Sequence, residues 1–225
     1  GYNIQEKNDN GESGVNVYLQ MGKLFYVHQL MLKASFDGRY GSDNLDGFEN
    51  SSVTIAPKYG IATENFKLSF GFDFVYDMRQ DEDKTFFLPQ AKILFNVGNG
   101  SFVPYASLDS RMVDNGYRSL TKRNPYLTQA GSLTSHYYDS SIGDAPLQER
   151  IVNSQEYNIR GGFYGSVSSV FSYRLFAGLS IVKDPVFFYN YYQTVNPTGV
   201  FNTVRDKRMN VFVIGAELEG RMSGS

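Results

Sequence analysis

The chain has 225 residues, a net charge of −2 and no cysteine, which excludes disulfides, thiol chemistry and cysteine ligation of zinc. Charged residues make up 20% of the sequence, so the chain offers no basic face of the kind that binds nucleic acid. Aromatic residues reach 16%, with 18 Phe and 17 Tyr, and both residue types favour strands over helices.

Nine segments alternate apolar and polar residues with a period of two, which is the pattern of strands with two different faces. Residues 66–78 are the clearest case: Phe70 and Phe74 share one face, while Lys67 and Asp73 share the other. The last segment is apolar on both faces in its first half, which leaves its facing open. In chain order the segments span about residues 15–21, 30–39, 53–61, 66–78, 87–97, 102–111, 157–163, 171–181 and 211–218.

The connections between these segments alternate in length. Short turns are predicted at residues 22–23, 63–65, 98–100 and 167–169, and long loops at about 41–50, 79–84, 113–153 and 184–207. Outer-membrane barrels place short turns at one rim and long loops at the other. No run approaches the roughly 20 apolar residues that a membrane helix needs, so contact with a membrane would require a barrel of strands.

The sequence therefore predicts an all-β fold, an antiparallel up-and-down (meander) β-barrel or part of one, with about 8–10 strands. Residues 1–225 would form a single β-barrel domain or a barrel fragment. Bacterial single-chain barrels have an even number of strands. An odd count of nine indicates a piece cut from a longer barrel, or a further strand hidden in the loop at 113–153.

The polar face of the predicted strands carries both signs of charge, which favours an aqueous lumen over the solvated face of a soluble sheet. Its charged residues are Lys33, Asp37, Arg39, Lys58, Lys67, Asp73, Asp77, Lys92, Asp109, Arg111, Arg160, Arg174 and Glu217.

Two long loops carry candidate binding features. The loop at 113–153 is rich in tyrosine, and either binds substrate, folds into the lumen or covers the surface. Residues 184–193 are dense in aromatic side chains, which favours a girdle at the membrane interface, or a strand continuing above the membrane, over a site for sugars or apolar ligands.

No motif for catalysis or for a metal is recognisable. The two histidines, His28 and His136, lie far apart in sequence without metal-ligand spacing. No Gly-x-Ser-x-Gly elbow, phosphate loop or Rossmann glycine fingerprint is present. We therefore expect no enzyme and no cofactor, and identify no catalytic, cofactor-binding or metal residues; ligand-binding residues cannot be named from the sequence.

Several short motifs follow one another in a familiar order. They are Asn-Pro-Tyr-Leu at 124–127, Glu-Arg at 149–150, the glycine-rich strand at 157–166, Phe-Ser-Tyr-Arg at 171–174, and residues 182–188. This order resembles the barrel region of TonB-dependent receptor-like outer-membrane proteins of Bacteroidetes type, most clearly over residues 85–190. The resemblance implies a location in the cell outer membrane and a role in substrate uptake through a periplasmic partner. It transfers no functional residue, and the chain has no recognisable plug domain or energy-coupling box.

The sequence thus predicts a barrel segment of a TonB-dependent receptor or transporter-like protein that takes part in nutrient binding or uptake. Its partners would be outer-membrane lipid and a small nutrient ligand, with no nucleic acid, and exposed strand edges could pair copies of the chain edge to edge. The alternatives are a soluble antiparallel barrel or sandwich that binds an apolar ligand, and a structural surface protein. The aromatic face distinguishes them, because Leu68, Phe70, Phe72 and Phe74 would be exposed in a membrane barrel and buried in a soluble protein.

Overall fold

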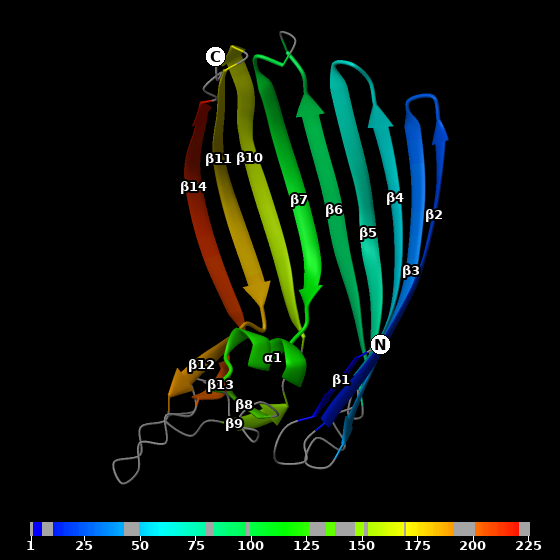
Figure 1. Ribbon diagram of the computed structural model, residues 1–225, viewed down its shortest axis with the longest axis vertical. Coiled ribbons are helices and arrows are strands. Elements are labelled where there is room, and N and C mark those ends of the chain that lie inside the picture. The colour runs from blue at the N-terminus through cyan, green and yellow to red at the C-terminus, as the bar shows by residue number, and fades with distance from the viewer. Residues whose placement is uncertain are drawn as a thin grey trace, which may run out of the picture.

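The computed structural model of the protein describes residues 2–5, 11–42, 50–79, 83–97, 100–126, 134–137, 147–150, 153–168, 170–190 and 201–220. Most of them form one antiparallel sheet in which neighbours in space follow chain order (Figure 1). Its ten strands are β1 (Tyr2–Gln5), β2 (Gly11–Phe25), β3 (His28–Ser42), β4 (Asn50–Ala62), β5 (Phe66–Arg79), β6 (Lys84–Phe95), β7 (Val103–Val113), β10 (Ser154–Ser168), β11 (Phe171–Lys183) and β14 (Arg208–Gly220).

The nine long strands of this sheet are the nine segments that alternation predicts. The all-β antiparallel meander is therefore confirmed, and short β1 adds a tenth strand by pairing with the start of β2. With a length of 11 to 15 residues the long strands exceed the 5 to 6 usual in soluble sheets and match tilted membrane strands. Apolar and polar side chains separate cleanly because the strand registers from β2 to β5 contain no one-residue shift.

One end of the sheet carries only tight connections, and we call it the turn end (top of Figure 1). The hairpin between β4 and β5 turns at residues 63–65, as predicted. The first turn is not at residues 22–23, because β2 continues to Phe25, which pairs with His28, and the chain reverses at Tyr26 and Val27. Residues 167 and 168 of the predicted turn at 167–169 are likewise part of a strand, because β10 continues through Ser168, and residue 169 lies outside the described residues. Residues 98–99 of the predicted turn at 98–100 lie outside the described residues.

The opposite end, the loop end, holds additional structure from two of the predicted loops. The segment between β7 and β10 contains helix α1 (Tyr117–Arg123), β8 (Thr134–Tyr137) and β9 (Leu147–Arg150), and the segment between β11 and β14 contains β12 (Val186–Asn190) and β13 (Phe201–Arg205). These four strands form a second sheet in the order β12-β13-β8-β9, which joins the two loops to each other. The loop at 113–153 thus contains two strands, β8 and β9, where one further strand was predicted, and neither joins the wall.

The large sheet is curled, and its two faces differ in chemistry. The outer, convex face carries the aromatic positions: the exposed fractions of Phe70, Phe72 and Phe74 are 51%, 36% and 43%, while Leu68 is half-buried. Among the described residues, buried apolar side chains are few, and a core cluster is formed by Val75, Phe86 and Leu88 on the inner face. The aromatic face therefore points outward, as expected for a barrel whose outer surface is covered by lipid.

Candidate functional site: the concave face and the loop end

The inner, concave face of the sheet brings the predicted polar side chains together. A groove of about 580 Å³ runs across it from β4 to β14. Six of the thirteen charged residues predicted for a lumen line this groove: Lys58, Lys92, Asp109, Arg160, Arg174 and Glu217. The others lie on the same face by strand register but outside the groove. The sequence pattern therefore identifies the face correctly, while the position of the groove depends on how the sheet curls.

Ion pairs on this face connect neighbouring strands. Arg174 on β11 contacts Glu217 on β14 at 3.0 Å between Nη1 and Oε2. Arg111 on β7 contacts Glu156 on β10 at 2.6 Å between Nη2 and Oε2. Each pair links residues that are direct partners in the strand register, so the charges reinforce the pairing of the strands.

The irregular part of the wall lies between β6 and β7. Their pairing is regular only from Ala91 to Leu94. Further toward the loop end, Gln90 Nε2 donates to the carbonyl oxygen of Ser110 at 3.3 Å, and the Ser110 hydroxyl donates to the carbonyl oxygen of Pro89. Met112 and Tyr157 there pack against the core cluster of the inner face. Side-chain hydrogen bonds therefore replace the backbone ladder at this point.

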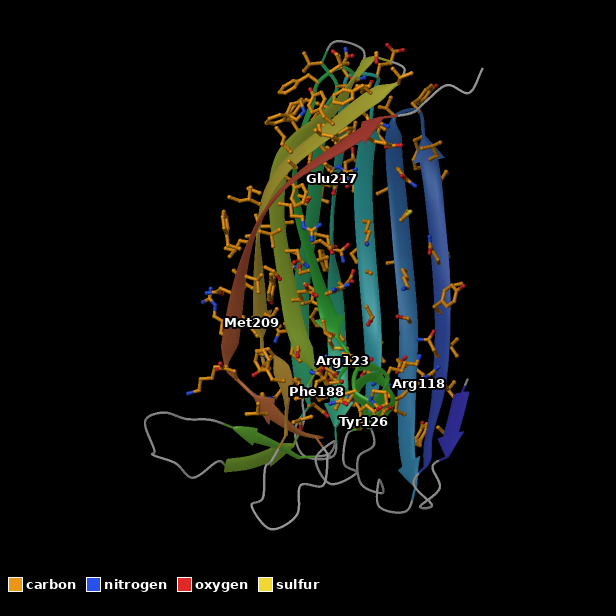
Figure 2. The ribbon with its side chains drawn as sticks, turned by 60° about the vertical axis from the view of Figure 1, so that its left-hand side comes forward. Arg118, Arg123, Tyr126, Phe188, Met209 and Glu217 are labelled. Atoms are coloured by element: carbon orange, nitrogen blue, oxygen red, sulfur yellow. The ribbon has the colours of Figure 1, made fainter. Side chains whose placement is uncertain are left out.

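Helix α1 closes over the concave face at the loop end (Figure 2). Its Leu120 is fully buried, and the segment before it is tied to the wall because Arg39 of β3 forms an ion pair with Asp114. After the helix, the backbone N–H of Asn124 donates to the carbonyl oxygen of Leu120, and the Asn124 side chain accepts from the backbone of Tyr126. The Asn-Pro-Tyr motif is thus the turn that ends α1.

A buried polar network holds this helix in place, with Asn115 at its centre. The exposed fraction of Asn115 is only 4%. Its amide nitrogen donates to Ser154 Oγ at 2.7 Å, its amide oxygen accepts from Arg123 Nη2 at 2.7 Å, and its backbone N–H donates to Asn153 Oδ1 at 3.2 Å. Buried polar groups need such partners, so this network fixes α1 to the start of β10.

The same network reaches the second loop and the wall. Ser154 Oγ donates to the carbonyl oxygen of Asp184 at 2.6 Å, and Arg205 of β13 donates to Asp184 Oδ1 at 2.7 and 3.1 Å. On the other side, Asn153 Nδ2 donates to Oδ2 of Asp77 on β5 at 3.4 Å, and the Asp77 side chain is fully buried. Residues from both long loops and from the wall therefore form one connected structure.

Arg123 links α1 to the aromatic segment that follows β11. Its guanidinium lies 5.9 Å from the ring centre of Phe188 on β12. Burial lowers the pKa of Arg123, and the charge of Asp114 acts in the opposite direction. Residues 186–190 of the aromatic segment form a strand of the second sheet, so they leave the wall after Lys183 rather than extending β11. The residues of this segment beyond Asn190 lie outside the described part of the chain.

Other sequence candidates are placed as follows. His28 lies at the turn end, where its Nδ1 is 2.6 Å from the Tyr59 hydroxyl. The backbone of His136 belongs to β8, and its side chain lies outside the description. Among the described residues, no three His, Asp or Glu side chains are grouped so that they could hold a metal ion. None of the helices described is both long and apolar enough to cross a membrane.

Comparison with known proteins yields structural neighbours only. No family model matches the sequence, and no curated protein matches it. The copper transporter OprC superposes with a TM-score of 0.57 and 12% sequence identity, covering 93% of this chain and 34% of that one. The ferripyoverdine receptor of the outer membrane of Pseudomonas aeruginosa gives a TM-score of 0.48 and 15% identity, covering 96% of this chain and 31% of that one.

The fold of the chain is thus like that of part of the copper transporter OprC. The chain spans about a third of the length of these neighbours. An identity of 12% concerns the fold alone and transfers no residue role.

Proposed function

We propose that the chain forms part of the wall of an outer-membrane β-barrel, and that the parent protein is a receptor or transporter of the TonB-dependent kind, of Bacteroidetes type, that takes up a nutrient. The observation that carries the proposal is the outward exposure of apolar side chains on strands from one side of the sheet to the other. Leu19 on β2, Ile55 on β4, Phe87 on β6 and Phe212 on β14 have exposed fractions of 59%, 48%, 56% and 66%. An apolar surface of this extent is not stable in water and suits lipid.

Aromatic contacts at the turn end support the same reading. Tyr59 stacks against His28 and Phe70, with ring centres 5.9 and 5.2 Å apart. Farther along the sheet, the Tyr173 hydroxyl donates to the carbonyl oxygen of Ser101 at 2.9 Å, while its ring contacts Phe163. Rings with an apolar body and a polar tip are typical of the girdles at membrane interfaces.

The loop end supports a ligand-meeting role for this side of the barrel. In outer-membrane barrels the long loops face the outside of the cell. Here the described parts of two such loops are joined by the second sheet and by the network around Asn115. The wall and these loops would together form the path that a nutrient meets first.

Two adjacent residues in the middle of β3 test the membrane assignment. Ala34 faces outward beside Leu19 and Ile55, whereas Ser35 faces inward beside Tyr18 and Thr54, and both are half-buried. In the 225-residue chain folded in lipid vesicles, Ala34→Arg should lower the free energy of unfolding by about 2–4 kcal/mol, because the charge enters lipid. Ser35→Arg should cost less than about 1 kcal/mol, since surface changes in contact with water are mild.

Urea titration of the two variants measures this difference. Equal losses for Ala34→Arg and Ser35→Arg would contradict the proposal, because both faces would then meet the same solvent. A chain that stays monomeric and folded in plain buffer would contradict it as well.

A further inference from the structure

The groove on the concave face has a chemistry of its own, beyond that of a lumen with mixed charges. Lys92 of β6, Ser107 of β7 and Arg160 of β10 are direct register partners, so they form one row across three strands. Lys92 and Arg160 are two strands apart, or about 9.5 Å. Both side chains are exposed to the groove. Within the described part of the chain, neither has a hydrogen-bond or ion-pair partner.

The stem of the Arg160 side chain lies against the neighbouring strand β11. Its Cγ lies 3.0 Å from where a Cβ would stand at Gly178, the residue opposite on β11. The missing side chain at Gly178 thus leaves room for the Arg160 stem to lie flat on the sheet. Among the described residues the guanidinium of Arg160 has no acidic partner, so its hydrogen-bonding capacity is available to a ligand.

The acidic residues near the row do not neutralise it. Glu217 is engaged by Arg174 at 3.0 Å. Asp73 accepts a hydrogen bond from Gln90 Nε2 at 3.0 Å and does not line the groove. Asp109 is the remaining carboxylate of the groove lining, and its one negative charge compares with the two positive charges of Lys92 and Arg160. The row therefore keeps an excess of positive charge.

An aromatic layer borders the row on the side toward the turn end. The rings of Tyr105 and Tyr164 are 5.9 Å apart and tilted by 52°. Phe176 lies in the same layer, with its ring over Gly215, where a Cβ would come within 2.2 Å of a ring atom. All three rings line the groove. The groove thus offers apolar contact area from the three rings next to the cationic groups of Lys92 and Arg160.

We propose that this groove binds an organic anion that carries a ring, with its acidic groups on Lys92 and Arg160 and its ring on Tyr105, Tyr164 and Phe176. Arginine and lysine form charge-assisted hydrogen bonds with carboxylates and phosphates, and tyrosine and phenylalanine favour flat apolar bodies. The volume of about 580 Å³ is within the range of small-molecule sites. This ligand class would make the proposed function more specific, whereas the site itself depends only on the residues of the concave face.

Benzene-1,4-dicarboxylate is a suitable probe, because it is a ring with two anionic groups and does not partition into detergent. Its binding to the 225-residue chain, folded in detergent, is measured by isothermal titration calorimetry. We expect its Kd to be at least about tenfold lower than those of the neutral diamide of the same ring and of succinate, which has no ring. A roughly tenfold increase in ionic strength should weaken the binding of the wild-type chain.

Variants separate the two halves of the site. K92Q/R160Q should bring the Kd of the dicarboxylate to within about twofold of that of the diamide, since the charged hydrogen bonds are lost. Phe176→Ala should weaken the dicarboxylate several-fold and leave succinate unchanged. The matched control is Lys33→Gln, which removes one positive charge from an exposed position of the same face outside the groove and should leave every Kd within about twofold.

Equal Kd values for the dicarboxylate and the diamide in the wild-type chain would overturn the proposal, and so would a K33Q effect as large as that of K92Q/R160Q. Binding that does not respond to ionic strength would overturn it even if the double variant fails to fold. These failures would leave the membrane assignment intact, because the Ala34→Arg and Ser35→Arg comparison does not involve the groove.

Discussion

Replacing Asn115 by alanine should release α1 from the wall. The substitution removes a hydrogen bond to Ser154 Oγ and another from the guanidinium of Arg123, both 2.7 Å long, at a position with an exposed fraction of 4%. A neutral hydrogen bond contributes about 1 kcal/mol and one to a charged group about 1.5–3 kcal/mol. The local free energy of opening should therefore fall by about 2–4 kcal/mol.

Hydrogen exchange followed by mass spectrometry measures this change directly. A loss of about 2–4 kcal/mol corresponds to exchange that is about 30- to 900-fold faster for the amides of α1. Amides in the middle of β3 and β4 should keep their rates, because the network does not reach them. The control is Asn16→Ala, which removes one exposed hydrogen bond to Asp37 at 3.1 Å and should leave α1 unaffected. Unchanged protection of α1 in Asn115→Ala would refute the role assigned to the network.

Two further predictions concern glycine and turn chemistry. Gly162→Ala should destabilise the chain by about 2–3 kcal/mol in a urea titration, because its Cβ would lie 2.1 Å from the carbonyl oxygen of Leu175 and force the backbone apart. Gly161→Ala should be neutral or stabilising, because its Cβ would lie 3.7 Å from the nearest atom. Equal effects of the two variants would contradict the register of β10. Tyr26→Gly should stabilise the first hairpin by up to about 1 kcal/mol, because Tyr26 has a φ of 51° that L-residues avoid. Val27→Gly relieves no such strain and should destabilise the hairpin. A gain in stability for both variants would argue against a turn at these two residues.

Much of the wall is predictable from the sequence, because alternation with a period of two directly records which face each side chain takes. Phe70 and Lys67 fall on the faces that their parity predicts. The first turn is not predictable in this way: glycine at position 22 suggests a reversal, yet Leu24 and Phe25 continue the pairing and place it at Tyr26. The pairing of β2 with β3 determines the position of this turn, and the turn preference of glycine does not.

The structure of the loop end cannot be predicted from alternation in the sequence. Asn115 and Asn153 have no periodic signal, and their meeting with Arg123 depends on contacts between segments far apart in the chain. The union of β8 with β13 is likewise a long-range pairing of two loops. The groove also requires the curl of the whole sheet, although the polar parity of Lys92 and Arg160 is visible in the sequence.

The orientation of the two faces relative to lipid is the central claim, and single cysteines test it most directly because the natural chain has none. Ile55 and Thr54 are adjacent in the middle of β4 and face outward and inward, respectively. The measurement is the fluorescence of an NBD label attached to Ile55→Cys or Thr54→Cys in vesicles whose acyl chains carry a doxyl quencher. We expect strong quenching at position 55 and little at position 54; equal quenching, or stronger quenching at position 54, would contradict the membrane-barrel account.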